Sequence, residues 1–351
     1  MKSLVIGASN CAAQAYRWSN SVDQHCDIRT LSIGPTSNGW DFEIHKSVDL
    51  QILHRKLSVN DTSFDSFRTL SEMQSYLKNR FSHFLIEYFN PIINWGCMGS
   101  AKEDKNHLEK LGKFVAYVAH GSDLIVPSIH ADIERFSPHR SLSREINDQL
   151  ESRAVDFQAA IAEHGTLTFV STLNLLDFAP DAIWLPVVAK SLYFLNPIQP
   201  MRKVPLVVHA PSDPIFKGTA YLEPILYEMN KKGVIRYIRC NRLDSSQLHQ
   251  LICRADIIID QISLGSYGVL AVDAMAAGKI VLGHVSSKVR SIYKTPVPIV
   301  EISPETLEGV LLDLLSQPTR INQIQTNSRA FSYEYHSGRF AALQLQKYFL
   351  A

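Results

Sequence analysis

The sequence is poor in cysteine, and its cysteines form no recognisable pattern. The 351-residue chain has five, Cys11, Cys26, Cys97, Cys240 and Cys253, and no two stand as a CxxC pair. An odd number of widely separated cysteines argues against a disulfide framework and against a zinc site built on thiolates. We therefore expect a protein of a reducing compartment, and the cytoplasm fits best.

Long apolar runs and an excess of charge of one sign are also missing. No uncharged apolar run reaches the roughly 18 residues of a membrane-spanning helix, and the N-terminal run is too short for a signal peptide. The formal net charge of +1 gives no general attraction to nucleic acid. A small basic cluster, Arg135, His139, Arg140 and Arg144, would suit an anionic acceptor or a lipid headgroup, but a solvated face is its default interpretation. We expect a soluble protein without a nucleic-acid partner and leave peripheral membrane contact open.

Several catalytic signatures are absent as well. The sequence has no GxSxG, no HExxH and no DxD, and GASN at 7–10 lacks the full GxGxxG of dinucleotide-binding loops. These absences argue against an α/β-hydrolase, a zinc protease and a typical dinucleotide enzyme. We expect neither a bound metal nor a resident cofactor.

What the chain does have is a regular alternation of apolar runs and helical stretches. The runs lie at 3–7, 26–33, 83–89, 113–120, 166–170 and 182–187, and again at 204–209, 234–240, 256–260, 279–285 and 298–302. Short continuous apolar runs are typical of strands buried on both faces of a parallel sheet. With 351 residues and 46% apolar residues, the chain can fill two cores. The pattern predicts an α/β protein of two Rossmann-like domains that face each other across a cleft.

A loose segment marks the expected boundary between the domains. AKSLYFLNPIQPMRKVP at 189–205 carries three prolines and little periodicity, and the alternation of strand and helix restarts after it. We expect an N-terminal domain over 1–190, a C-terminal domain over 191–331 and a final helix over 332–351.

The strongest candidate for a ligand-binding loop is DQISLGSYGVLAVDAMAAGK, at 260–279. It joins a predicted strand to a helix of small residues through a turn with two glycines. Such a turn lets the amides around Ser266, Tyr267 and Gly268 face a phosphate, with the helix dipole behind them. Asp273, further along the helix, would then accept hydrogen bonds from sugar or ribose hydroxyls. The alternative is a close packing contact between helix and sheet, with Asp273 solvated.

Two further loops follow predicted strands. In HAPSDPIFKGT at 209–219, Lys217 lies where its ammonium would meet the same phosphate, although a solvated lysine is the alternative. In AHGSDLIV at 119–126, His120 ends a buried run next to Asp123. That histidine would donate a hydrogen bond to a substrate oxygen or to a negatively charged leaving group. The alternative is a structural role.

Together these loops resemble a known family. From HAPSDPIFKGT to ADIIIDQISLGSYGVLAVDAMAAGK, the second half is similar to the donor-binding domain of GT-B glycosyltransferases, especially glycosyltransferase family 4. The family pattern there is roughly E-G-F-G-x-x-x-x-E-A-M-A-x-G-x-P-V. GASNCAAQAYRW and HGSD in the first half look like the acceptor-domain loops of bacterial members from polysaccharide and glycolipid pathways.

The resemblance implies a site for a nucleotide-sugar donor, linked to UDP or GDP. It gives Lys217 to the donor diphosphate, together with the amides near Tyr267, Gly268 and Val269. Asp273 takes the place of the family's second glutamate, which holds the ribose hydroxyls.

The resemblance also extends to the first half of the chain. His120 matches a histidine that contacts the transferred sugar, Gly7 belongs with the donor side, and Asn10 and Asp123 belong with the acceptor side. The acceptor would be a saccharide or a glycolipid, the reaction would retain the anomeric configuration without a metal, and the final helix would cross back to the first domain. The oligomeric state is not implied.

Two departures from the family pattern stand out. The family's first glutamate falls on Gly265, and its usual arginine falls on Ser212, which we still place among the donor-binding residues. Asp260 or a water molecule is a candidate substitute for the missing carboxylate. A nucleotide-sugar epimerase stays open as another function because it shares the two-domain architecture, and the departures raise a non-catalytic binding or scaffold module as a further alternative.

Overall fold

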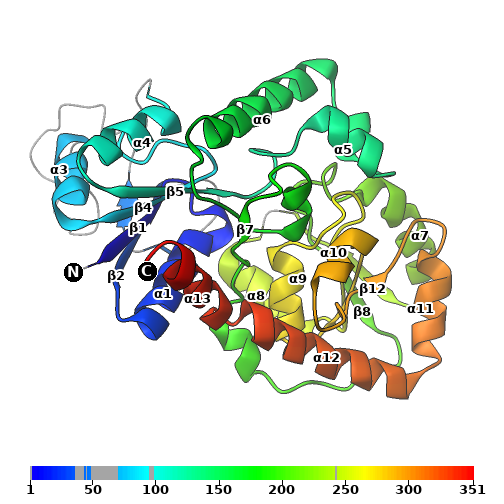
Figure 1. The fold of residues 1–351 in the computed structure, drawn as a ribbon. Helices are drawn as coiled ribbons and strands as arrows, with labels where there is room; N and C mark the ends of the chain where they lie inside the picture. Colours follow the sequence, from blue (N-terminus) through cyan, green and yellow to red (C-terminus); the bar gives the residue numbers. More distant parts are fainter. Residues whose placement is uncertain (1, 36–42, 45, 49–69, 95–98, 242) are drawn as a thin grey trace, which may run out of the picture.

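The computed structural model describes residues 2–35, 43–44, 46–48, 70–94, 99–241 and 243–351. Within these residues the chain folds into two parallel β-sheets, each with helices packed on both faces (Figure 1). The predicted α/β class with two Rossmann-like units is confirmed. We call the unit around the first sheet the N-lobe and the unit around the second sheet the C-lobe.

The N-lobe sheet has the strand order β3-β2-β1-β4-β5-β6-β7, and neighbouring strands pair in parallel. Its strands are β1 (Ser3–Gly7), β2 (Arg29–Pro35), β3 (Lys46–Val48), β4 (His83–Glu87), β5 (Phe114–Ala119), β6 (Thr168–Val170) and β7 (Ile183–Trp184). Its helices are α1 (Gln14–Cys26), α3 (Leu70–Arg80), α4 (Ala101–Lys110), α5 (Pro127–Ile133) and α6 (Arg144–His164). The strand order reverses between β1 and β4, so the loops that follow these two strands part and leave a crevice.

Apolar side chains on the two faces of the N-lobe strands fill two separate cores. In β1, Leu4 and Ile6 cluster with Trp18 of α1, whereas Val5 belongs to the core on the other face, with Phe157 of α6. All five of these side chains are fully buried. A strand buried on both faces needs the continuous apolar sequence that β1 has.

The C-lobe sheet has the strand order β12-β11-β10-β8-β9, again with parallel neighbours. Its strands are β8 (Leu206–His209), β9 (Arg236–Arg239), β10 (Ile257–Ile259), β11 (Ile280–Gly283) and β12 (Val300–Glu301). Its helices are α7 (Thr219–Lys231), α8 (Ser245–Arg254), α9 (Val269–Ala276), α10 (Ser287–Ile292), α11 (Leu307–Leu315) and α12 (Pro318–His336). Here the order reverses between β8 and β10, so the loops after these strands frame the second crevice.

The C-terminal part of the chain ties the two lobes together. The chain passes from one sheet to the other between Trp184 and Leu206, and the expected boundary at 190 and 191 falls in this segment. The segment expected as one final helix contains the end of α12 and all of α13 (Arg339–Tyr348). Helix α12 runs along the C-lobe, and α13 lies against α1 of the N-lobe, so the two chain ends come close together (Figure 1). Lys2 Nζ donates to the Leu350 carbonyl at 2.9 Å.

The described strands overlap every predicted apolar run, and one edge strand was not predicted. This is β3, a strand of three residues that pairs with β2. No helix in the described part of the chain is both long and apolar enough to cross a membrane. Cys11, Cys26, Cys240 and Cys253 are free thiols, and Cys97 lies outside the described residues.

Removing the buried contact of α13 should destabilise the N-lobe. Leu345 is fully buried in the core that contains Trp18, so Leu345→Ala should lower the free energy of unfolding by about 2 to 5 kcal/mol. On the same helix Leu343 is 44% exposed, and Leu343→Ala should change it by less than about 0.5 kcal/mol. Urea unfolding of both variants checks this, and equal effects would show that α13 does not depend on its N-lobe contact.

Candidate functional site

The two crevices open onto one cavity between the lobes. Its volume is about 640 Å³. From the N-lobe it is lined by Ser9, Cys11, Ala12, Arg17 and Tyr88, and from the C-lobe it includes Ser212, Lys217, Leu243, Val269, Leu270 and Asp273. These residues come from the loops that follow β1, β4, β8, β9 and β10, or from the helices that begin after them. Such carboxyl-terminal crevices are where open parallel sheets bind ligands.

On the C-lobe wall, Lys217 meets the start of helix α9. Its Nζ donates to Asp260 Oδ1 at 2.9 Å, while the Gly268 amide donates to Asp260 Oδ2 at 2.9 Å. A Cβ on Gly268 would lie 3.1 Å from Lys217 Nζ, so the glycine permits this close approach. Lys217 and Gly268 therefore lie close together with the Asp260 carboxylate between them, and their common contact with a phosphate stays a prediction.

The residues at the start of α9 line the cavity, whereas those of the preceding turn are buried. Val269 and Leu270 line the cavity at the first turn of α9, which has no side-chain cap. The side chain of Tyr267 is buried, with its hydroxyl hydrogen-bonded to Tyr293 at 2.5 Å and to His336 Nε2 at 2.9 Å. Ser266 is also buried. These two residues support the turn, so any contact with an anion would come from the main chain there.

Asp273 is buried and joins the lobes. Its Oδ1 accepts from Arg17 Nη1 of the N-lobe at 3.2 Å and from the Lys190 amide at 2.9 Å. Burial raises the pKa of the Asp273 carboxyl, and the neighbouring Arg17 opposes that rise. Asp273 lines the cavity. Because its side chain is buried, the interpretation of the sequence in which Asp273 is solvated is wrong. A ribose contact for Asp273 stays a prediction.

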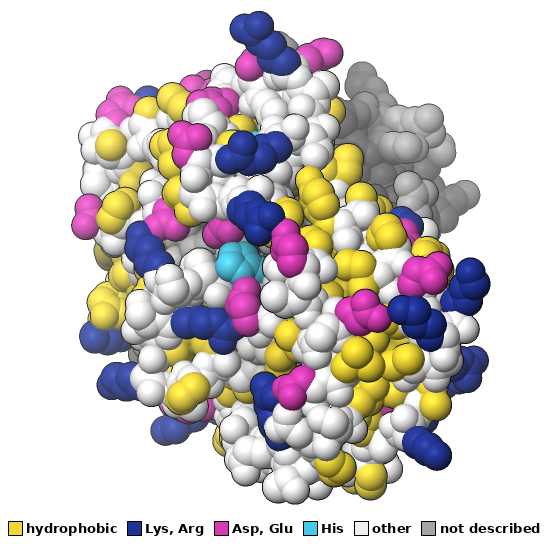
Figure 2. Space-filling view, turned by 90° about the vertical axis from the view of Figure 1, so that its right-hand side faces the viewer, with side chains coloured by type: hydrophobic (Ala, Val, Ile, Leu, Met, Phe, Trp, Pro, Cys, Tyr) yellow, Lys and Arg dark blue, Asp and Glu magenta, His cyan; other side chains and the backbone are white. Residues whose placement is uncertain are grey.

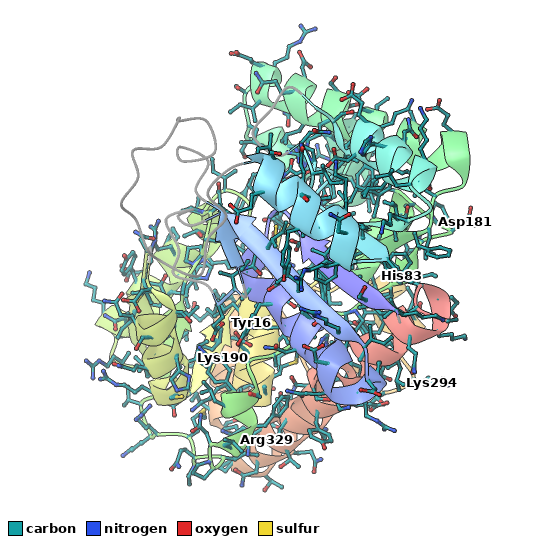
Figure 3. All side chains as sticks on the ribbon, turned by 90° about the vertical axis from the view of Figure 1, so that its left-hand side faces the viewer. Tyr16, His83, Asp181, Lys190, Lys294 and Arg329 are labelled. Carbon is teal, nitrogen blue, oxygen red and sulfur yellow. The ribbon has the colours of Figure 1, made fainter. Side chains whose placement is uncertain are left out.

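Lys190 adds a second cationic side chain at the same junction. It lies where the two lobes meet (Figure 3), and its Nζ pairs with Glu43 Oε1 at 2.7 Å. Arg17, Lys190 and Lys217 thus line the cavity together, with Asp273 as the acidic side chain among the lining residues. Each of these three cations is paired with a carboxylate, Arg17 with Asp273, Lys190 with Glu43 and Lys217 with Asp260, so an anionic ligand would have to compete with these carboxylates for them.

The N-lobe wall is held by a fully buried carboxylate, Glu87, at the end of β4. It accepts from the amides of Ser9 and Asn10 at 3.2 and 2.7 Å. Asn10 and Tyr88, in the two loops held this way, have φ values of 47° and 57°. Left-handed conformations at residues other than glycine are uncommon and cluster at functional sites.

His120 is fixed from several sides. Its Nε2 lies 3.2 Å from Glu87 Oε1, and its ring stacks on Trp18 with the ring centroids 5.5 Å apart. The backbone amides of His120 and Gly121 donate to the buried carboxylate of Asp123. His120 and Asp123 are therefore held next to the loops of the N-lobe wall but are not among the residues that line the cavity. The predicted sugar contact of His120 and the acceptor-side role of Asp123 stay predictions.

The remaining predicted residues fall in different places. Ser212 lines the cavity. Gly7 packs against Ile33, where a Cβ would come within 2.5 Å of Ile33 Cγ1. The side-chain amide of Asn10 donates to the Glu43 carbonyl at 2.9 Å. None of these observations tests a ligand contact.

A second bridge joins the lobes on the far side of the α9 turn. Glu134, after α5, accepts from His284 Nε2 at 3.1 Å, and His284 Nδ1 contacts Glu301. These two carboxylates raise the pKa of His284 to about 9. Gly265, with φ of 65°, makes room, since a Cβ there would lie 2.0 Å from Glu134 Oε1. The space that a side chain at position 265 would need is thus filled by a carboxylate from the other lobe.

Three members of the basic cluster noted in the sequence are paired with neighbouring side chains, while Arg135 and Arg144 stay largely exposed. Arg135 pairs with Glu305 at 2.6 Å, Arg144 lies 3.6 Å from Asp148, and His139 is buried against Asn147. On the face drawn in Figure 2, acidic and basic side chains are interspersed. In the described part of the chain, no three His, Cys, Asp or Glu side chains come together as a metal site would require.

Comparison with known proteins shows likeness at the level of structure alone. No protein-family model and no curated protein matches the sequence. Among solved structures, the chain is similar to sucrose-phosphate synthase from Thermosynechococcus elongatus, with 11% identity, 100% of this chain and 98% of that chain covered, and a TM-score of 0.58. It is also similar to Anabaena HepE, solved with UDP and glucose, with 10% identity, coverage of 99% and 98%, and a TM-score of 0.61. A third is WaaG, a glycosyltransferase involved in lipopolysaccharide biosynthesis, with 14% identity, full coverage of both chains and a TM-score of 0.51.

The chain has the GT-B fold. The expected architecture of two Rossmann-like units facing each other across a cleft is confirmed.

Sequence reasoning missed four residues that build the site: Arg17, Glu87, Glu134 and Lys190. Glu87 carried a signal, because an acid at the end of a buried strand needs a partner. The other three act across the junction between lobes, and Arg17 lies 256 residues from Asp273 in the sequence. No local pattern encodes such a contact.

The bridge through His284 should make stability depend on pH. A histidine whose pKa is raised on folding stabilises the folded form fully below its ordinary pKa of 6.5, and this stabilisation is lost as pH rises through about 9. The melting temperature of the wild type should therefore exceed that of His284→Gln near pH 6.5, and the difference should vanish by about pH 10. A difference that stays constant over this range would contradict the charged bridge.

Proposed function

We propose that this chain is a glycosyltransferase that transfers a sugar from a nucleotide-sugar donor, linked to UDP or GDP, to an acceptor hydroxyl. The observation that carries the proposal is the convergence of Lys217 and the first turn of α9 on the cavity between the lobes. A cation beside uncapped helix amides suits a diphosphate. HepE, which was solved in complex with UDP, has the same fold. The glycosyltransferase WaaG has it as well.

The leaving group would be stabilised by groups that the fold already holds in place. As the bond from sugar to diphosphate breaks, negative charge grows on the diphosphate. Lys217 Nζ and the amides of Val269 and Leu270 would face that charge, while Arg17 and Lys190, each paired with a carboxylate, line the same cavity. Donors fixed before the reaction need little rearrangement during it. Such a site supplies the stabilisation without a metal, as the resemblance to family 4 implies.

The acceptor would approach from the N-lobe loops. Ser9 and Tyr88 line that wall, and Glu87 holds His120 and the amides of the first loop in fixed positions. His120 would orient the transferred sugar, and Asn10 and Asp123 would shape the acceptor side. Closure of the lobes over a bound donor would exclude water, which would otherwise hydrolyse it.

The biological setting follows from the same resemblance. We propose a saccharide or glycolipid acceptor, retention of anomeric configuration and a role in polysaccharide or glycoconjugate synthesis on the cytoplasmic side, with peripheral membrane contact left open.

Incubation of the purified protein with a panel of UDP- and GDP-sugars tests the function. We expect one donor to raise the melting temperature, and an acceptor mixture to gain the mass of one sugar residue. Interconversion of the nucleotide-sugar without an acceptor would indicate an epimerase instead. Binding without any turnover would indicate a non-catalytic module.

Removing Lys217 should weaken the donor site. A hydrogen bond to a charged group contributes about 1.5 to 3 kcal/mol, so Lys217→Ala should lower donor affinity or turnover by about 10- to 150-fold. Lys232, which pairs with Glu308 on the C-lobe surface, provides the control, and Lys232→Ala should leave both unchanged. Calorimetry and initial rates check this, and unchanged values for Lys217→Ala would remove the lysine from the site.

Removing His120 should act on rate more than on nucleotide binding. If the ring orients the sugar, His120→Ala should lower turnover by about 100-fold or more while leaving the affinity for the nucleoside diphosphate nearly unchanged. Equal losses in both quantities would show that His120 acts only through the structure of the N-lobe wall.

A further inference from the structure

Asp260 accepts hydrogen bonds from Lys217 and from the Gly268 amide, two donors that the resemblance to family 4 assigns to the diphosphate. It lies directly after β10, at the point where the C-lobe strand order reverses, and is 2% exposed. Each oxygen takes one donor: Oδ1 accepts from Lys217 Nζ and Oδ2 from the Gly268 amide, both at 2.9 Å. The structure thus holds an anion of its own at the candidate anion site.

Lys217, Gly268 and Asp260 lie close together, and their hydrogen bonds limit what else can bind there. A Cβ on Gly268 would lie 3.1 Å from Lys217 Nζ and 3.8 Å from both Asp260 oxygens. A phosphate oxygen cannot accept from the Gly268 amide while Asp260 does, because a backbone amide has one hydrogen to donate. The lysine, with three hydrogens on a flexible stem, can turn from one acceptor to another.

The charges nearby make Asp260 the counter-ion of Lys217. In the described part of the chain, Asp260 is the acid that forms an ion pair with this lysine. The neighbouring His209 uses both ring nitrogens, with Nδ1 2.9 Å from the Ile259 carbonyl and Nε2 2.8 Å from Thr219 Oγ1. Burial lowers the pKa of His209, so it carries no charge at neutral pH. Without a ligand, the positive charge of Lys217 is therefore already compensated.

We propose that Asp260 competes with the donor diphosphate for Lys217 and the Gly268 amide, and so sets the affinity for the nucleotide. This inference rests on the proposed function. A diphosphate that also reaches the amides of Val269 and Leu270 can displace the carboxylate, whereas a small anion that gains fewer contacts is disfavoured. Asp260 thus lowers the affinity of the site for the nucleotide and raises its selectivity for a diphosphate over small anions. A residue that binds the donor sugar would instead raise the affinity for the donor.

The sign of the change in affinity tests this. In Asp260→Asn the side chain loses its charge and keeps one acceptor oxygen, so it cannot accept from Lys217 and from the Gly268 amide at the same time. Calorimetry with pyrophosphate, UDP and GDP should show binding about 5- to 20-fold tighter than in the wild type. Unchanged or weaker binding would overturn the proposal, because a residue that only supports the loop would weaken the site when altered.

The other end of the same strand offers a matched control. Asp256 is 5% exposed, and its Oδ2 accepts from Arg202 Nη1 and from the Leu206 amide, both at 2.7 Å. It has the same kinds of partner, one cation and one amide, but both donate to one oxygen, and it is not among the cavity-lining residues or their partners. Asp256→Asn should leave pyrophosphate binding unchanged. A similar gain in affinity for both variants would contradict a local role for Asp260.

A double substitution shows whether the gain passes through Lys217. Adding Lys217→Met to Asp260→Asn should remove most of the gain, since the released cation is then absent. A gain that persists in full in the double variant would overturn the competition. If the folded wild type and Asp260→Asn bind neither pyrophosphate nor any nucleoside diphosphate, the proposed function itself fails, and this inference fails with it.

Discussion

The contact between Lys217 and the first turn of helix α9 is the feature on which the rest of the site depends. Two loops of the C-lobe, one after β8 and one after β10, meet there because the strand order reverses between those strands. Gly268 allows the ammonium to approach the backbone, and Asp260 keeps both in place. A cation and the uncapped first turn of a helix at one cavity suit a diphosphate, and this is what directs the proposal towards nucleotide-sugar chemistry.

The other half of the site depends on how the lobes are joined. Asp273 receives hydrogen bonds from Arg17 and from the Lys190 amide, so one buried carboxylate connects the N-lobe, the connecting segment and α9. On the opposite side Glu134 reaches across to His284. Helix α13 then packs on α1, which fixes the lobes at a third place. The cavity is therefore a product of contacts between residues that lie far apart in the sequence.

Much of the fold was predictable because each β-strand of a parallel sheet leaves a local signature. The apolar runs SLVIG and DIIID mark β1 and β10, whereas β3 is a strand of three residues at the sheet edge and has no such run. The site was predictable in part. Lys217, Gly268 and Val269 come together because loops after parallel strands meet at one edge, and that rule can be applied to a sequence. The partner of Asp273 could not be foreseen, because Arg17 comes from the other lobe and no spacing relates the two.

The most direct test of the central claim is a crystal structure of the protein with a nucleoside diphosphate bound. The account predicts phosphate oxygens within hydrogen-bonding distance of Lys217 Nζ and of the amides at the first turn of α9, with the Asp260 carboxylate displaced from the Gly268 amide. A diphosphate bound elsewhere, with the contacts of Lys217, Asp260 and Gly268 unchanged, would contradict it.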